Sequence, residues 1–138
     1  MNGPEQTPAD ELPLVLVADD NEDIRRFIRL SLSRVGYEII EAQDGREALE
    51  LARTRHPAVA VLDVMMPELD GCEVTETLRA SPITRGIRVI LLSGRAQAPD
   101  VARGMAAGAD HYLVKPVSVD ALREGVRAVL DAPRPEQA

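Results

Sequence analysis

The chain is poor in several residue types, and each scarcity excludes a class of protein. Its 138 residues include one cysteine, no tryptophan and 2% aromatic residues. A single cysteine, Cys72, cannot form an internal disulfide and suits a reducing compartment. No apolar stretch approaches the ~18–20 residues that a membrane span needs. Residues 1–6 lack the basic and apolar regions of a signal peptide. We therefore expect a cytoplasmic protein with no membrane partner.

Positive charge is also scarce, with 16 Lys and Arg against 23 Asp and Glu and a net charge of −7. Direct nucleic-acid binding depends on basic patches that neutralise phosphates, so this balance argues against it. Neither G-x-x-x-x-G-K-[ST] nor G-x-G-x-x-G occurs, which argues against nucleotide binding by those loops. Most of the acids fit a solvated surface, but an acidic pocket would attract a divalent cation.

The length predicts one domain, since domains typically have ~100–200 residues. A chain of this size buries enough surface to form a core without a disulfide or a structural metal. Residues 1–13 and 131–138 are polar and contain prolines, so we expect flexible tails on either side of a domain at 14–130.

Five apolar runs of strand length predict the fold class. They are continuous rather than alternating, which is typical of parallel strands covered by helices on both faces. Helical segments separate them, so right-handed crossovers and an α/β doubly wound sheet follow. The runs are Leu14–Ala18, Tyr37–Ala42, Ala58–Leu62, Ile87–Leu92 and His111–Val114.

The helices are predicted from their ends and their apolar spacing. Asn21 is placed to cap the first helix, and Asp44-x-x-Glu47 and Asp70-x-x-Glu73 read as capping boxes. The apolar stripe expected on the first helix is Ile24, Phe27, Ile28, Ser31 and Val35.

The fourth helix, expected from about Pro99 to Ala107, should be the least stable. Gly104 lies in its interior, which costs ~1 kcal/mol relative to alanine. The fifth helix is expected to begin after Ser118 and to bury Leu122, Val126 and Val129.

Charged residues stand at the exits of three predicted strands. Asp19 and Asp20 close the first run, Asp63 closes the third, and Lys115 closes the fifth. Ligands bind outside the carboxyl ends of the strands in open α/β sheets. We therefore expect three acids and one amine to converge in one crevice.

These residues belong to a set of five motifs in fixed order, and with them the chain resembles the receiver domains of two-component response regulators. The resemblance implies a flavodoxin-like (βα)5 domain with the sheet order 2-1-3-4-5. The motifs are Asp19-Asp20, Asp63-x-x-Met66-Pro67-x-x-Asp70-Gly71, Ser93-Gly94, Gly108-Ala-Asp110 and Tyr112-x-x-Lys115-Pro116.

The resemblance implies that Asp63 accepts a phosphoryl group and becomes an aspartyl phosphate. The donor would be the phosphohistidine of a histidine kinase or a phosphotransfer protein. Asp19, Asp20, Asp63 and the backbone carbonyl of Met65 would hold Mg²⁺. Neighbouring acids raise one another's pKa by like-charge repulsion, and a bound cation offsets that repulsion.

The resemblance also assigns roles to residues at the ends of the fourth and fifth strands. Ser93 and Lys115 would contact the phosphoryl group, and Ser93 and Tyr112 would act as switch residues. Pro116 would follow a cis peptide bond. The switch would change the face made by the fourth helix, fifth strand and fifth helix, and so signal to an unknown protein target. The domain would catalyse its own phosphorylation without being a turnover enzyme, as a monomer or a phosphorylation-dependent dimer.

Other interpretations stay open from the sequence alone. A receiver-fold module that binds proteins without phosphorylation is the main alternative, and a phosphatase that uses Asp63 is another. Tyr112 fits a core residue as well as a switch. Arg25, Arg26 and Arg29 are expected on the exposed side of the first helix, as a kinase contact or as a solvated face.

Overall fold

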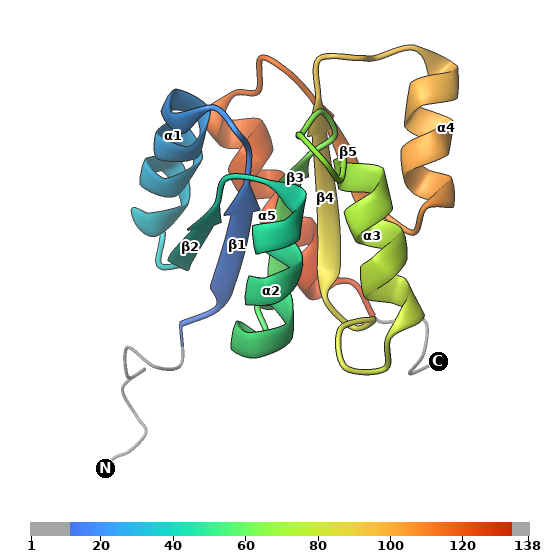
Figure 1. Ribbon diagram of the computed structural model, residues 1–138. Helices are drawn as coiled ribbons and strands as arrows, with labels where there is room; N and C mark the ends of the chain where they lie inside the picture. The colour runs from blue at the N-terminus through green and yellow to red at the C-terminus, as the bar shows by residue number, and fades with distance from the viewer. Residues whose placement is uncertain (1–11, 134–138) are drawn as a thin grey trace.

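The computed structural model describes residues 12–133, so most of the predicted tails at 1–13 and 131–138 lies outside the described residues. It contains one parallel sheet of five strands in the order β2-β1-β3-β4-β5 (Figure 1). The predicted α/β class and strand order are therefore confirmed. The strands are β1 Leu14–Ala18, β2 Glu38–Ala42, β3 Val59–Asp63, β4 Arg88–Ser93 and β5 His111–Val114.

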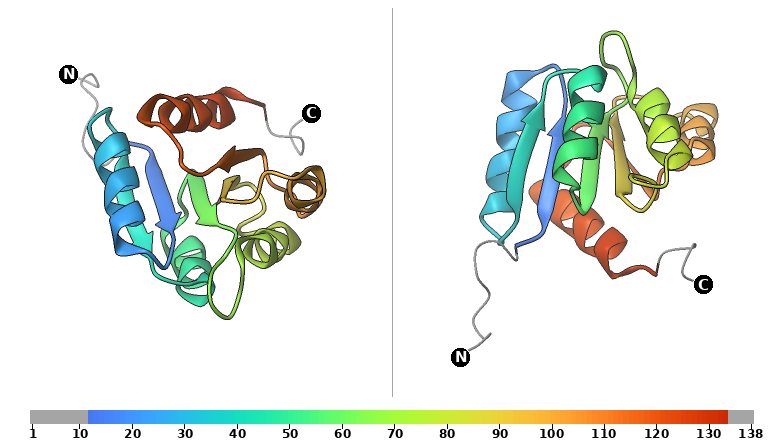
Figure 2. Two further views of the ribbon diagram at one scale, coloured as in Figure 1. Left: turned by 90° about the horizontal axis from the view of Figure 1, so that it is seen from above. Right: turned by 60° about the horizontal axis from the view of Figure 1, so that its bottom comes forward.

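Five helices alternate with the strands and cover both faces of the sheet. The helices α1 and α5 lie on one face, and α2, α3 and α4 lie on the other (Figures 1 and 2). All strand carboxyl ends meet at one edge, which is the upper edge in Figure 1. The helices are α1 Glu22–Ser33, α2 Gly45–Arg55, α3 Gly71–Ala80, α4 Ala98–Ala106 and α5 Val119–Asp131.

Two strands extend one residue beyond the runs predicted from hydrophobicity. Asp63 ends β3 and Ser93 ends β4, whereas the predicted runs stopped at Leu62 and Leu92. The ladder depends on backbone pairing, which continues past the last apolar side chain. Asp63 pairs with Leu92 in the register, so its backbone is fixed by the sheet.

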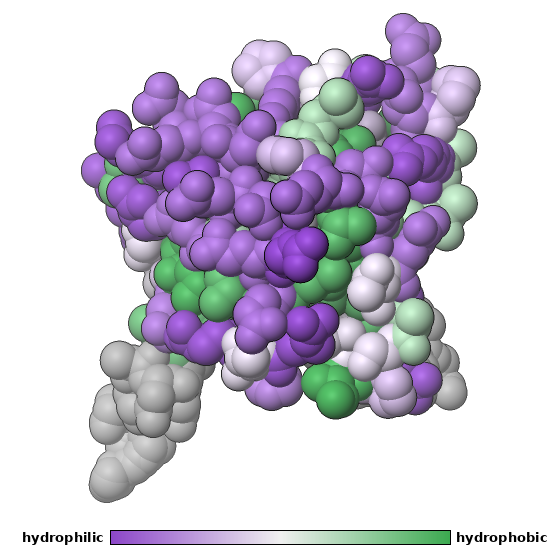
Figure 3. All heavy atoms as spheres, in the orientation of Figure 1, coloured by the Kyte–Doolittle hydropathy of each residue, from purple (hydrophilic) through white to green (hydrophobic). Residues whose placement is uncertain are grey.

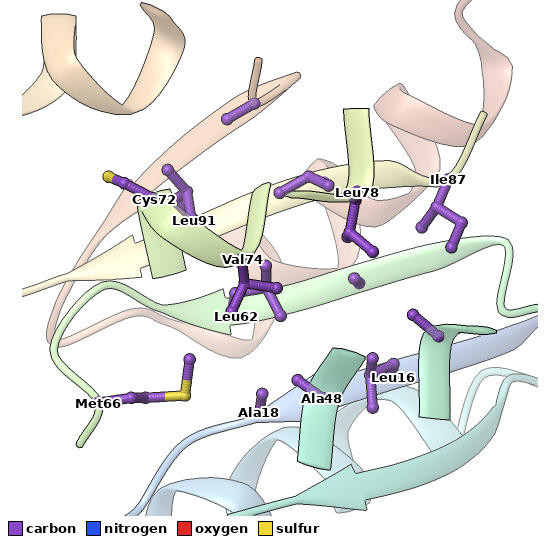
Figure 4. Packing of buried hydrophobic residues seen from close by; sticks show 14 of the residues in the cluster. Leu16, Ala18, Ala48, Leu62, Met66, Cys72, Val74, Leu78, Ile87 and Leu91 are labelled. Carbon is purple, nitrogen blue, oxygen red and sulfur yellow. The ribbon is translucent and has the colours of Figure 1, made fainter. Parts of the chain in front are cut away.

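The sheet separates two hydrophobic layers, because successive side chains of a strand point to opposite faces. Figure 4 shows the layer between the sheet and α2 and α3, where Leu16, Leu62 and Leu91 meet Val74 and Leu78. Full burial of each such leucine contributes roughly 1.5–3 kcal/mol. The opposite layer packs α1 and α5 against the sheet and includes Val15, Val17, Ile28, Leu32, Val61, Ile90, Leu92, Leu122 and Val126.

The outer surface over α2 and α3 is mainly hydrophilic, with small hydrophobic areas between the helices (Figure 3). Within the described residues, no helix has both the length and the hydropathy to cross a membrane.

The stripe predicted for α1 is partly wrong. The helix buries Ile28, Ser31 and Leu32, while Phe27 and Val35 are 37% and 48% exposed. Val35 lies beyond the end of α1 at Ser33, so helical spacing does not apply to it.

Most predicted helix starts are confirmed. The side chain of Asn21 caps α1, and Ser118 caps α5. Asp70 and Glu73 form a complete capping box on α3. The box predicted on α2 is incomplete, because the Glu47 carboxylate accepts the N–H of Gln43 and not that of Asp44.

Gly104 has a packing role that helix propensity does not reveal. A Cβ at this position would lie 2.8 Å from Cδ1 of Leu91 and 3.0 Å from Cδ2 and Cε2 of Tyr112. The glycine therefore lets α4 approach β4 and β5, and it makes room for the tyrosine ring.

Gly104→Ala should destabilise the protein by up to about 2 kcal/mol, because an overpacking cost of about 1–3 kcal/mol outweighs the ~1 kcal/mol gained from helix propensity. Urea unfolding measures the difference. Ala102→Gly, at an exposed position of α4, is the control and should show the propensity cost alone. A Gly104→Ala variant that is more stable than the wild type would contradict the packing role.

Candidate functional site

Three carboxylates meet at the carboxyl edge of the sheet. Asp19 follows β1 directly, Asp20 is next in the chain, and Asp63 ends β3. One oxygen from each lies within 4.8 Å of the others. Asp19 and Asp63 are only 1% and 4% exposed, whereas Asp20 is exposed. The pocket is therefore acidic and open on the side of Asp20.

Lys115 brings one positive charge to the two buried acids. Its Nζ lies 3.2 Å from Oδ2 of Asp19 and 3.2 Å from Oδ2 of Asp63. The residue directly follows β5, and its N–H donates to the carbonyl of Ser93 at 2.8 Å. The Lys115–Pro116 peptide bond is cis. The four residues that sequence reasoning placed in one crevice thus lie together.

Every polar group of Asp19 is engaged. Its Oδ1 accepts the N–H of Asn21 at 2.9 Å, and its Oδ2 accepts from Lys115. Its N–H donates to the carbonyl of Ala42 at 3.2 Å, and its own carbonyl accepts Nη1 of Arg25 at 2.7 Å. By contrast, the Asp20 carboxylate makes no hydrogen bond or ion pair within residues 12–133, so its oxygens are available to a ligand.

The ionisation of Asp63 reflects its crowded position. Burial raises the pKa of its carboxyl, and the neighbouring Asp19 charge raises it further, to about 6. Two contacts act to lower this pKa. They are the charge of Lys115 and the N–H of Met65, which donates to Oδ1 of Asp63 at 3.2 Å. Burial and the like charge of Asp19 together therefore outweigh the one lysine in setting the pKa of Asp63.

Gly71 fixes the loop that follows Asp63. A Cβ on this glycine would lie 2.5 Å from the carbonyl oxygen of Asp63, and its N–H donates to the carbonyl of Val64 at 3.0 Å. The start of α3 is therefore held against the end of β3. This close approach explains why a glycine follows Asp70 in the motif.

Ser93 and Tyr112 are joined through one loop residue, Arg95. The Oγ of buried Ser93 accepts the N–H of Arg95 at 3.0 Å, and the hydroxyl of Tyr112 donates to the Arg95 carbonyl at 2.9 Å. The tyrosine ring also packs against the core. Tyr112 is thus both a core residue and a tether of the segment between β4 and α4.

Arg25 was expected on the exposed side of the first helix, and this prediction is wrong. Its side chain is only 11% exposed and contacts both Asp19 and Glu41. Helical spacing places Arg25 beside apolar Ile24, at the border of the buried stripe, where a spacing rule cannot decide exposure. The sequence signal that comes closest to revealing its burial is the adjacency of β1 and β2, which brings Glu41 within reach of Arg25.

Comparison with known proteins decides the family. Residues 15–127 match the response regulator receiver domain family. The chain belongs to this family. Among solved structures, the receiver resembles the chemotaxis protein CheY4 of Vibrio cholerae with a TM-score of 0.81 and 31% identity, over 86% of this chain and 98% of that one. The Francisella response regulator 1452 receiver domain matches with a TM-score of 0.80 and 39% identity, over 86% of this chain and 96% of that one.

Curated relatives are longer proteins. Response regulator MprA of Mycolicibacterium vanbaalenii is 42% identical over 122 residues, which cover 88% of this chain and 52% of the relative. The probable transcriptional regulator ycf27 of Cyanophora paradoxa is 42% identical over 116 residues, which cover 84% of this chain and 47% of the relative. The receiver thus spans about half the length of these relatives.

The acidic pocket of the receiver fits Mg²⁺, which prefers hard oxygen ligands and retains several waters. Three carboxylates supply such oxygens at mutual distances that one ion can bridge. Exposed Asp20 leaves space for water on the outer side. A divalent cation would also offset the repulsion that raises the pKa of Asp63.

Asp63→Asn should stabilise the metal-free protein at neutral pH. A carboxyl whose folded pKa of about 6 exceeds its unfolded pKa opposes folding once it is ionised. The gain should be about 1–3 kcal/mol at pH 7.5, and it should shrink as the pH falls from about 6 to 4, where Asp63 becomes protonated.

Urea unfolding in EDTA across this pH range measures both effects. Asp131→Asn, which removes an exposed acid at the end of α5, is the control and should give a small difference. A wild type more stable than Asp63→Asn at pH 7.5, or a difference that does not vary with pH, would refute the raised pKa.

Proposed function

We propose that this receiver accepts a phosphoryl group on Asp63 from the phosphohistidine of a histidine kinase or phosphotransfer protein. The observation that carries the proposal is the arrangement at one sheet edge. Asp63 shares its pocket with two acids suited to a divalent cation and with Lys115 at 3.2 Å. A carboxylate in such a site has a nucleophilic oxygen and a fixed positive charge beside it.

In the transfer, an Asp63 oxygen forms a bond to phosphorus as the phosphorus–nitrogen bond of the donor breaks, and the imidazole nitrogen keeps the electron pair. Asp19, Asp20, Asp63 and the carbonyl of Met65 would hold Mg²⁺, which supplies positive charge next to the phosphoryl oxygens when bound. Lys115 supplies a further point charge, and Ser93 supplies a hydroxyl donor. Positioning and charge account for most of the catalysis of phosphoryl transfer.

The hydrogen bonds of Arg95 provide a path from Asp63 to the surface. If the Ser93 hydroxyl turns to a phosphoryl oxygen, the Arg95 N–H loses its acceptor. The carbonyl of the same residue accepts from Tyr112, so movement of this loop also releases the tyrosine. We infer that the face formed by α4, β5 and α5 then changes and signals to a protein target.

The start of α4 is suited to such a change. Its N-cap residue, Gln97, makes no side-chain capping bond. A helix end without a cap lacks a stabilising contribution of about 1 kcal/mol. Two packings that differ by a few kcal/mol can be exchanged by one modification.

A cavity beside the acidic pocket suits the phosphodonor protein. It has a volume of about 560 Å³ and is lined mainly by apolar side chains of α1 and of the segment after β5. Phe27 on its border is 37% exposed. We infer that an apolar helix face of the donor docks here, next to its phosphohistidine. The lining residues are Asp23, Ile24, Phe27, Leu92, Lys115, Pro116 and Val117.

The proposal predicts the outcome of incubation with acetyl phosphate and Mg²⁺. Intact mass spectrometry should show a gain of one phosphoryl group in the wild type, because the domain supplies its own catalytic groups. Asp63→Asn should show no gain. Asp100→Asn, in the first turn of α4 outside the pocket, should behave as the wild type.

A wild type that gains no mass with acetyl phosphate or phosphoramidate would reject the phosphoacceptor function and favour a module that works without phosphorylation. Equal labelling of Asp63→Asn would place the acceptor elsewhere.

A further inference from the structure

Arg25 joins the acidic pocket to the edge of the sheet. It lies in the first half of α1, yet it contacts the residue after β1 and a residue of β2. Its Nη1 donates to the backbone carbonyl of Asp19 at 2.7 Å. Its Nε donates to Oε1 of Glu41 at 3.1 Å. Both acceptors are thus held by one planar guanidinium, whose donors have a rigid geometry.

The other end of the contact is fixed by the sheet. Glu41 lies in β2 and pairs with Val17 of β1 in the register. Its second oxygen accepts Nη1 of Arg29 at 2.6 Å. Burial acts to raise the pKa of Glu41, but hydrogen bonds from Arg29 and Arg25 lower it below its ordinary value. Glu41 therefore stays ionised at neutral pH and keeps its hold on Arg25.

The carbonyl that Arg25 binds belongs to the peptide unit between Asp19 and Asp20. Because a peptide unit is planar, fixing the carbonyl of Asp19 also fixes the N–H and the Cα of Asp20. The Asp20 side chain has no partner of its own within residues 12–133. The backbone that carries it therefore decides which positions its carboxylate can reach.

We propose that Arg25 is a positioning residue for the cation site. Through the Asp19 carbonyl it holds the Asp19–Asp20 peptide in the orientation that turns the Asp20 carboxylate toward Asp63. The inference rests on the proposed binding of Mg²⁺ between these acids, and it adds a residue that touches neither the cation nor the phosphoryl group.

Arg29 offers a matched control, because it shares one contact of Arg25 and lacks the other. Both arginines bind Glu41 from consecutive turns of α1. Only Arg25 reaches Asp19, and its side chain is 11% exposed against 41% for Arg29. If Arg25 served only to tie α1 to β2, removal of either arginine would have similar consequences.

The test compares Arg25→Met with Arg29→Met in the full chain, since methionine keeps an unbranched apolar stem. Calorimetric titration with MgCl₂ alone measures the dissociation constant, and urea unfolding in EDTA measures stability. A charge-assisted hydrogen bond is among the stronger ones in a protein, so its loss releases the Asp19–Asp20 peptide. We therefore expect Arg25→Met to bind Mg²⁺ about tenfold more weakly, or more weakly still, and Arg29→Met to stay within about twofold of the wild type.

A second readout separates positioning from chemistry. The initial rate of phosphorylation by acetyl phosphate is measured as a function of Mg²⁺ concentration. For Arg25→Met the concentration that gives half the maximal rate should rise about tenfold, and the maximal rate should stay within about threefold of the wild type. Because Arg25 acts on the carboxylates that bind the cation and not on the phosphorus, its loss should change the Mg²⁺ requirement and not the maximal rate.

Mg²⁺ affinity that is equal in the wild type and Arg25→Met, or weakened equally in both methionine variants, would overturn the role of Arg25. If Arg25→Met does not fold, Arg25→Gln and Arg29→Gln carry the same comparison with the same criteria, because the shorter, uncharged side chain does not reach the Asp19 carbonyl. The titration contains no phosphodonor. A receiver that binds Mg²⁺ with the expected difference but gains no phosphoryl group would therefore disprove the proposed function and leave this inference standing.

Discussion

Like-charge repulsion between Asp19 and Asp63 is the constraint on which the rest of the structure depends. Both carboxylates are almost fully buried at adjacent strand ends, and a single amine, that of Lys115, lies between them. Burial and the Asp19 charge keep the pKa of Asp63 raised despite this amine. The pocket thus has an unbalanced negative charge at neutral pH. That imbalance favours a divalent cation and, in its presence, a phosphoryl group.

The fold opposes this repulsion with contacts that act on the backbone. The register of β3 and β4 fixes Asp63, and Gly71 packs directly on its carbonyl. Asp19 is held at its N–H by β2 and at its carbonyl by Arg25. Acidic side chains remain close together because the sheet core beneath them is well packed, with Leu16, Leu62 and Leu91 buried in one layer (Figure 4).

The sequence allowed prediction of whatever depends on the order of residues along one element. Continuous apolar runs identified the strands, and charged residues at their ends identified the pocket. What could not be predicted depends on side chains from different elements. The burial of Arg25 requires Glu41 on a neighbouring strand, and the tether at Arg95 requires Ser93 and Tyr112 on two strands. Gly104 appeared as a weak point of α4, whereas it makes room for Leu91 and Tyr112. The strand order came from family resemblance, because crossover rules alone permit several orders.

The most direct test of the central claim is the effect of Mg²⁺ on thermal unfolding of the wild type and of Asp20→Asn. Asp20 is exposed, so its replacement should leave the core intact. If the three carboxylates form one cation site, Mg²⁺ at 100 times its dissociation constant should stabilise the wild type by about 2.7 kcal/mol. The unfolding temperature should then rise by a few degrees, and Asp20→Asn should lose most of this rise. An equal rise in both proteins, or none in the wild type, would show that Asp19, Asp20 and Asp63 do not act as one site.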